Sequence, residues 1–190
     1  MLVLASASPR RRELLTQAGY QFSIHPAHIP EDPHPNEDPI AYVTRLAKQK
    51  AQAVFNQLSE SDTDPALQVL GADTTVTLDN QILGKPENEA DAARMLRILS
   101  GRTHRVITGV ALVTATRTEV AAEVTAVQFL TLSEKEIAAY IATGEPSDKA
   151  GAYAIQGHAA RWIPRIQGCY FNVVGLPISL VATLLDSLAS

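Results

Sequence analysis

Short apolar runs alternate with amphipathic segments along the chain, beginning at its first residues. Leu2 to Ala5 is an apolar run of the kind that forms a buried strand. Ser8 and Pro9 then supply a helix N-cap followed by proline at the first helical position, and Gly19 ends the helix. The pattern therefore predicts a strand, a turn and a helix within residues 1–19.

The remaining sequence continues this interleaving of helices and strands. Asp38 and Pro39 begin a long predicted helix, the capping box of Ser133 and Glu136 begins another, and Asp79-Asn80 predicts a turn. Predicted helices cover residues 40–58, 89–99, 133–142 and 177–188, and predicted strands cover residues 21–27, 67–78, 105–114, 119–130, 153–155, 162–166 and 170–174.

Interleaving of this kind is typical of α/β proteins, and it predicts a mixed β-sheet flanked by helices. Arg105 to Thr114 and Glu119 to Leu130 are expected to pair as a hairpin that forms a second lobe, with a cleft between two lobes. No repeat or low-complexity segment divides the sequence, so residues 1–190 are expected to form a single domain.

Composition and charge narrow the classes of function. Of the 190 residues, 46% are hydrophobic and 19% charged, and the net charge is −4. An acidic chain with few aromatic residues is not expected to bind nucleic acid or an anionic membrane. The single cysteine, Cys169, excludes an internal disulfide. The sequence shows no signal peptide and no membrane-spanning run, so it predicts a cytoplasmic protein.

The first turn of the predicted N-terminal helix is unusually basic. Arg10, Arg11 and Arg12 lie where the helix dipole disfavours cations, and the free backbone N–H groups there suit an anion. The hydroxyls of Ser6 and Ser8 add donors, and arginine binds phosphate through paired hydrogen bonds. Two interpretations stay open from this motif: a phosphate site, or a capped helix with a solvated basic turn.

Two carboxylates are candidates for metal chemistry. Asp73 interrupts an apolar strand beside Gly71, a place suited to a Mg²⁺ ligand or a water activator, or to a carboxylate that satisfies turn amides. Glu31, in a proline-rich loop, is either a second metal ligand or a solvated side chain.

Two lysines and one amide complete the candidates. Lys50 lies in the apolar stripe of its predicted helix, so it either points into a cleft as a phosphate ligand or extends to the edge of the core. Lys85 lies in a Gly-Lys-Pro loop that is either a phosphate clamp or a surface turn. Gln156 has an amide that can read a base edge, or that is simply hydrogen-bonded within an irregular loop. The P-loop pattern is absent, so that class of nucleotide enzyme is disfavoured.

Several segments also match a known family in order along the chain. They are Leu-Ala-Ser-Ala-Ser-Pro-Arg-Arg at 4–11, Arg-Leu-Ala-Lys-Gln-Lys-Ala at 45–51, Gly-Ala-Asp-Thr at 71–74, Gly-Lys-Pro at 84–86, Ser-Gly-Arg-Thr-His at 100–104, Asp-Lys-Ala-Gly-Ala-Tyr-Ala-Ile-Gln-Gly at 148–157 and Asn-Val-Val-Gly-Leu-Pro at 172–177. With them the sequence resembles the Maf family of nucleoside triphosphate pyrophosphatases. The resemblance implies a mixed α/β fold with a cleft, like that of the ITPases, a divalent metal and a homodimer.

The resemblance further implies a subfamily, because three positions separate the branches of the family. Here these positions are Arg10, Thr74 and Gln156, a set similar to that of the dTTP/UTP branch. A glutamine amide offers both a donor and an acceptor, which suits the edge of uracil or thymine. The family usually has two consecutive acids where this chain has Pro30-Glu31, so only Glu31 matches.

The resulting hypothesis is metal-dependent hydrolysis of dTTP, UTP and modified pyrimidine nucleotides to the monophosphate and pyrophosphate, which would clean the nucleotide pool. Glu31 and Asp73 would hold Mg²⁺ or Mn²⁺, and Asp73 would also activate the attacking water. The expected phosphate ligands are Ser6, Ser8, Arg11, Lys50 and Lys85, and the expected specificity residues are Arg10, Thr74 and Gln156. The alternative is a non-catalytic nucleotide-binding regulator of cell division and septum formation.

Overall fold

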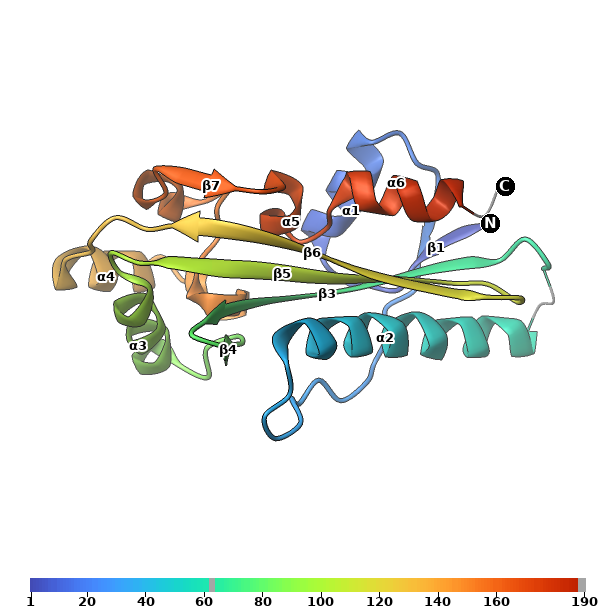
Figure 1. The fold of residues 1–190 in the computed structure, drawn as a ribbon, viewed down its shortest axis with the longest axis horizontal. Coiled ribbons are helices and arrows are strands. Elements are labelled where there is room, and N and C mark those ends of the chain that lie inside the picture. The colour runs from blue at the N-terminus through green and yellow to red at the C-terminus, as the bar shows by residue number, and fades with distance from the viewer. Residues whose placement is uncertain (62–63, 188–190) are drawn as a thin grey trace. The chain divides into compact units, whose positions relative to one another are not determined.

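The computed structural model describes residues 1–61 and 64–187. The strands among these residues form one seven-stranded sheet in the order β2-β1-β3-β5-β6-β7, with β4 paired to β3. The sheet is mixed, because β1 runs parallel to β2 and β3 whereas β4 and β7 run antiparallel to their neighbours. The predicted α/β class, with a mixed sheet flanked by helices, is confirmed (Figure 1).

The helices and strands follow one another along the chain with few long loops. In order they are β1 (Leu2–Leu4), α1 (Pro9–Gln17), β2 (Ser23–Ile24), α2 (Pro39–Ser61), β3 (Gln68–Leu78), β4 (Gln81–Leu83), α3 (Glu89–Leu99), β5 (Thr103–Val113), β6 (Thr118–Gln128), α4 (Glu134–Ile141), the 3₁₀ turns η1 (Glu145–Asp148), η2 (Ala150–Ala152) and η3 (His158–Trp162), β7 (Arg165–Gln167), α5 (Tyr170–Val174) and α6 (Ile178–Asp186).

Contacts between residues divide the chain into two compact units. The first unit comprises Met1–Asp73, Thr108–Glu123 and Gly175–Ser190, and the second comprises Thr74–Ile107 and Val124–Val174. Strands β3, β5 and β6 each contribute residues to both units. The single domain and the cleft between two lobes stay predictions.

In the first unit, helix α2 covers one face of β1, β3 and β5, while α1 and α6 lie on the other side of these strands (Figure 1). Side chains alternate between the two faces of a strand, so every second residue faces α2. The residues packed together on that face are Val3, Ala5, Ala47, Ala51, Val54, Leu67, Val69, Ala111 and Val113. The face is therefore built from small and β-branched side chains, which let the helix lie close to the sheet.

Two glycines bring the backbone of α2 directly against the sheet. A Cβ built on Gly71 of β3 would lie 2.2 Å from the carbonyl oxygen of Ala47, and one on Gly109 of β5 would lie 2.4 Å from that of Val43. Real Cβ atoms do not approach backbone so closely, so neither position accepts another residue without moving α2. The sequence therefore fixes both the depth and the position of α2 on these strands.

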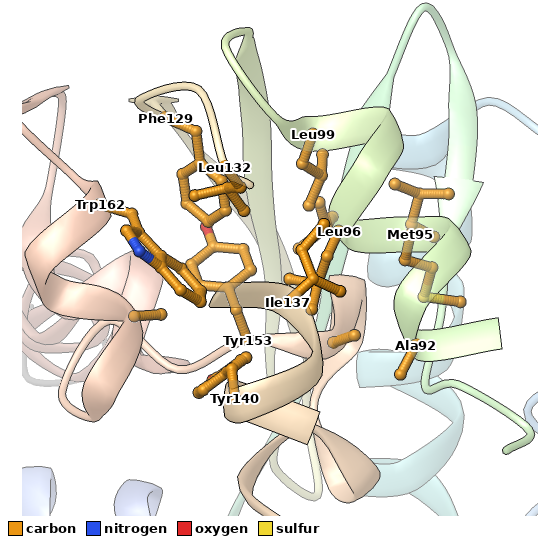
Figure 2. Packing of buried hydrophobic residues seen from close by; sticks show 14 of the residues in the cluster. Ala92, Met95, Leu96, Leu99, Phe129, Leu132, Ile137, Tyr140, Tyr153 and Trp162 are labelled. Atoms are coloured by element: carbon orange, nitrogen blue, oxygen red, sulfur yellow. The ribbon is translucent and has the colours of Figure 1, made fainter. Parts of the chain in front are cut away.

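The second unit has its own core, centred on aromatic side chains (Figure 2). Phe129 and Tyr153 lie edge to face with ring centroids 4.8 Å apart, and Tyr140 and Trp162 do so at 5.0 Å. Such T-shaped pairs add about 1 kcal/mol each beyond the area they bury. Apolar side chains of α3 and α4 complete this core: Ala92, Met95, Leu96, Leu99 and Ile137.

The predicted helix starts and turns are confirmed where a local motif specified them. The Ser8 hydroxyl caps α1, Ser133 and Glu136 form the predicted capping box of α4, and α3 has the predicted bounds. Asp79 and Asn80 both have positive φ, 52° and 62°, and join β3 to β4 through the predicted turn. Local chemistry was sufficient at these positions because each motif satisfies its own backbone groups.

Two predicted strands near the C-terminus, 153–155 and 170–174, are wrong, and a third, 162–166, is confirmed only in part. Residues 170–174 form helix α5. Of the predicted strand 162–166, only residues 165 and 166 pair in the sheet, as part of β7 (Arg165–Gln167). No strand covers residues 153–155, because Gly151 and Ala152 both adopt positive φ, 67° and 60°, and turn the chain. Periodicity alone does not distinguish a short apolar strand from a short helix or an irregular segment.

Within residues 1–61 and 64–187, no helix combines the length and the apolar composition that crossing a bilayer requires. Residue 188, the predicted end of the last helix, lies outside the described residues.

The contact between Gly109 and α2 predicts a large effect of one added methyl group. Gly109→Ala should lower the free energy of unfolding by about 3 kcal/mol, because the methyl group meets backbone atoms that cannot move separately. Gly84→Ala is the matched control, since its Cβ would meet nothing within 4 Å, and it should change stability by less than about 1 kcal/mol. Urea unfolding of both variants measures this, and equal stabilities would contradict the close approach.

Candidate functional site

Lys50 of α2 and Asp73 of β3 form a buried ion pair in the first unit. The Lys50 ammonium lies 2.6 Å from Asp73 Oδ1, and each residue is only 7% exposed. Asp73 follows Gly71 by two positions, so it lies on the same face of β3 that α2 covers. The close packing at Gly71 therefore brings the lysine and the carboxylate together.

Glu31 adds a second carboxylate to the same ammonium. Its Oε1 lies 2.7 Å from Lys50 Nζ, and its side chain is 48% exposed. Glu31, Lys50 and Asp73 together are called the carboxylate–lysine cluster below. The cluster has one buried and one solvent-facing acid, so a ligand arriving from solvent meets Glu31 first.

The loop that carries Glu31 is tied to α2 by two side chains. The Tyr42 hydroxyl donates to the Glu31 carbonyl oxygen at 2.8 Å. Arg45 donates to both carboxylate oxygens of Glu37 at 2.6 Å and to the Asp32 carbonyl oxygen at 3.2 Å. Because the loop has no helix or strand of its own between residues 25 and 38, these bonds hold Glu31 in place.

Arg11 lies beside the cluster and has several partners in the first unit. Its Nη1 donates to the Ala72 carbonyl oxygen at 2.8 Å and to Ser6 Oγ at 3.2 Å, and its Nε donates to the Gly175 carbonyl oxygen at 2.8 Å. These bonds hold the guanidinium next to Ala72, the residue before Asp73. An arginine held in this way presents a fixed positive charge.

Burial and neighbouring charges shift the pKa values of Asp73 and Arg11 in opposite directions. Burial raises the pKa of Asp73 above its ordinary value of 3.8, while the nearby charges of Lys50 and Arg11 lower it. Burial lowers the pKa of Arg11, and Asp73 opposes that change. Asp73 is thus a carboxylate made more basic by its surroundings, which is what a group that accepts a proton requires.

The donor set fits the expected divalent cation. The carboxylates of Glu31 and Asp73 already share one cation, the Lys50 ammonium. Within the described residues, no three His, Cys, Asp or Glu side chains gather to hold a metal by themselves. A Mg²⁺ or Mn²⁺ ion at Glu31 and Asp73 would therefore take its remaining ligands from phosphate and water, as Mg²⁺ commonly does.

The two N-terminal serines lie at the start of α1, as the sequence predicts. Ser8 Oγ accepts the backbone N–H of Arg11 at 3.5 Å, and Ser6 Oγ accepts that of Ser8 at 3.2 Å. Ser6 is buried and Arg10 is half-buried. Ser6, Ser8, Arg11, Glu31, Lys50 and Asp73 are therefore gathered within one unit.

The other three candidates belong to the second unit. Thr74 follows Asp73 in β3 and is half-buried, and Lys85 is exposed in the loop between β4 and α3. Gln156 is exposed in a turn between η2 and η3. Their predicted roles toward phosphate and base stay predictions.

The sequence interpretation missed three side chains that build the site. They are Glu37, Tyr42 and Arg45, to which the sequence analysis assigns no role. A signal that could have found Tyr42 and Arg45 is their i, i+3 spacing in the first turns of α2, next to the loop that carries Glu31 and Glu37.

These features define a class: a mixed α/β protein in which a buried carboxylate lies beside a lysine and an arginine. Within that class, the family model described as Maf-like protein matches residues 1–188, and the chain belongs to this family.

The curated relatives are similar over nearly their full length. A protein named dTTP/UTP pyrophosphatase from Koribacter versatilis (strain Ellin345) is 53% identical over 180 residues, covering 95% of this chain and 90% of the relative. One from Geobacillus sp. (strain WCH70) is 51% identical over 94% of this chain and 92% of the relative, and one from Moorella thermoacetica is 53% identical over 97% and 93%. The solved structure of the Staphylococcus aureus Ham1 protein is only weakly similar, with a TM-score of 0.43 and 9% identity over 67% of this chain and 71% of that one.

The bond between Arg45 and Glu37 predicts a pH-dependent contribution to stability. Arg45 lowers the pKa of Glu37 from 4.5 to about 2, so the pair stabilises the fold above pH 4.5 and loses this effect as the pH falls toward 2. Arg45→Gln should therefore cost about 1–2 kcal/mol at pH 7, allowing for solvent screening, and less at pH 3.

Chemical unfolding of wild type and Arg45→Gln at pH 7, 5 and 3 measures this difference. Arg97→Gln is the control, because Arg97 makes a comparable bond to Glu134 on an exposed surface. Its effect on stability should be small, since solvent screens the charges of an exposed pair. A cost for Arg45→Gln that does not change with pH would contradict the assignment to Glu37.

Proposed function

We propose that this protein hydrolyses dTTP and UTP to the nucleoside monophosphate and pyrophosphate. The observation that carries the proposal is the carboxylate–lysine cluster, in which one ammonium joins a buried and an exposed carboxylate. Membership of the Maf family and the names of relatives about 50% identical support the same activity.

Asp73 is proposed as the catalytic base. A water oxygen forms a bond to the α-phosphorus, the bond from that phosphorus to the oxygen bridging to the β-phosphorus breaks, and the water's proton passes to Asp73. The raised pKa of Asp73 favours acceptance of that proton. A divalent ion held by Glu31 and Asp73 would neutralise charge on the phosphate oxygens.

The fixed cations are proposed to stabilise the triphosphate. Arg11 offers a guanidinium held by hydrogen bonds to Gly175, Ser6 and Ala72 in the first unit. Lys50 can exchange its carboxylate partners for phosphate oxygens. Ser6, Ser8 and Lys85 are assigned the same role from the sequence. Because such groups are held in place before the substrate arrives, they stabilise charge in the transition state with little reorganisation.

Arg10, Thr74 and Gln156 are proposed to select the base, with modified pyrimidine nucleotides as additional substrates. The carboxylates argue against the alternative of a non-catalytic nucleotide-binding regulator, because acids facing a polyanion weaken binding unless a cation accompanies it. Cytoplasmic location and a homodimer remain predictions of the sequence.

Removing the charge of Asp73 tests the proposed base. Asp73→Asn should lower kcat for UTP by about 10³-fold or more, because the amide cannot accept a proton. Its thermal stability should fall, because the amide removes one counter-charge from the buried Lys50 ammonium, so turnover is compared at a temperature at which both proteins are folded. Asp79→Asn, in the exposed turn after β3, is the control and should keep wild-type turnover. Pyrophosphate release with Mg²⁺ is the assay, and wild-type turnover by Asp73→Asn would refute the assignment.

Changing Gln156 tests base selection separately from chemistry. Gln156→Glu should lower kcat/KM for UTP and dTTP about tenfold or more, because the carboxylate loses the amide's donor. The residue is exposed, so the melting temperature should stay unchanged. Gln167→Glu is the control, because it is an equally exposed glutamine in β7. An unchanged preference among UTP, dTTP, CTP and GTP would count against the role of Gln156.

A further inference from the structure

Gln156 occupies the third position of a tight turn in the second unit. The turn is closed by the backbone N–H of Gly157, which donates to the Ala154 carbonyl oxygen at 3.1 Å. Within the described part of the chain, the Gln156 side chain is exposed and makes no hydrogen bond. The direction of its amide therefore depends on the backbone of the turn.

A pair of side chains holds both ends of this turn. The Tyr140 hydroxyl, from α4, accepts the backbone N–H of Ala154 at 3.2 Å and donates to Glu145 Oε1 at 2.7 Å. The other carboxylate oxygen of Glu145, Oε2, accepts the backbone N–H of His158 at 3.1 Å. The bonds reach the residues two positions before and two positions after Gln156.

Gly157 shows how tightly Glu145 lies against the turn. A Cβ built on Gly157 would lie 2.0 Å from Glu145 Oε1 and 2.3 Å from Glu145 Cδ. Its φ of −105° is accessible to any residue, so the reason for glycine here is space alone. The carboxylate occupies the volume that any other side chain at this position would need.

The core of the second unit anchors the pair. Tyr140 is 1% exposed and packs edge to face on Trp162, as its position in Figure 2 illustrates. Burial and the neighbouring Glu145 raise the pKa of Tyr140, so its hydroxyl keeps the proton that it donates. The turn is thus connected to a rigid aromatic cluster through charge-assisted and backbone hydrogen bonds.

We propose that Tyr140 and Glu145 are positioning residues that set the nucleobase preference by fixing the turn that carries Gln156. Neither side chain needs to touch the nucleotide. The inference rests on the proposed function, since it deepens the role given there to Gln156. It predicts that loosening the turn weakens discrimination between pyrimidine nucleotides more than it weakens the chemical step.

Two variants test the proposal, each by removing a different group that holds the turn. Tyr140→Phe keeps the ring packing and removes the hydroxyl, and Glu145→Gln keeps the shape and removes the charge. Both should speed amide exchange at Ala154 and His158 roughly five- to tenfold, the loss expected for one hydrogen bond. Both should lower the ratio of kcat/KM for UTP to that for CTP about fivefold, mainly through KM for UTP, with kcat little changed. Glu134→Gln, an exposed acid of α4, is the control and should change neither quantity.

A third measurement separates positioning from general destabilisation. Gly157→Ala should strongly loosen the turn in the wild-type background but have little further effect in Glu145→Ala, where the space is vacated. If Tyr140→Phe does not fold, Glu145→Gln and this double-mutant cycle carry the test.

The outcomes distinguish the inference from the proposed function. Wild-type exchange rates, or an unchanged UTP:CTP ratio in an active Glu145→Gln protein, overturn the inference and leave the proposed function intact. Absence of pyrophosphate release from every nucleoside triphosphate by the wild-type protein overturns the proposed function, and the base preference with it. Faster exchange together with a lower ratio supports the inference.

Discussion

The backbone contact between α2 and the sheet is the constraint on which the rest of the first unit depends. At Gly71 and Gly109, the absence of a side chain lets the backbone of this helix lie directly against strands β3 and β5. The helix therefore lies at one depth and one register on the strands. That register places Lys50 opposite Asp73, two residues beyond Gly71, and so creates the buried ion pair.

In this ion pair, burial of Asp73 and the charges of its neighbours act on the pKa of the carboxyl group in opposite directions. A buried carboxylate is destabilising unless cations compensate it, and Asp73 has Lys50 and Arg11 nearby. Its pKa is nevertheless raised, which indicates that burial outweighs the compensation. Glu31 enters the cluster from a loop that Tyr42 and Arg45 attach to the same helix. One helix thus supplies the lysine and positions the second carboxylate.

In the second unit, too, side chains from outside an irregular segment hold that segment in place. Its turn around Gln156 has no regular structure to fix it, so Tyr140 and Glu145 connect it to an aromatic core. In both units, a segment without helix or strand that bears a candidate site residue is attached to a regular element by side-chain hydrogen bonds to its backbone. Rigidity is thus supplied from outside the loop, where function requires an exposed side chain.

Much of this protein was determined by sequence features that act locally. The Ser8 cap, the Ser133 capping box and the Asp79-Asn80 turn formed as predicted, because each satisfies backbone groups within a few residues. The period of two along β3 already placed Asp73 on the same face as Gly71.

Tertiary structure alone decided the rest. Residues 170–174 form a helix in which Asn172 and Val174 are buried while Tyr170 and Phe171 are exposed, an arrangement that the run of apolar residues did not predict. Local sequence also left Lys50 with two interpretations, and only the packing of α2 on the glycines put its ammonium on two carboxylates. Contacts between residues far apart in the chain depend on the shape of the whole packed unit, which no local pattern encodes.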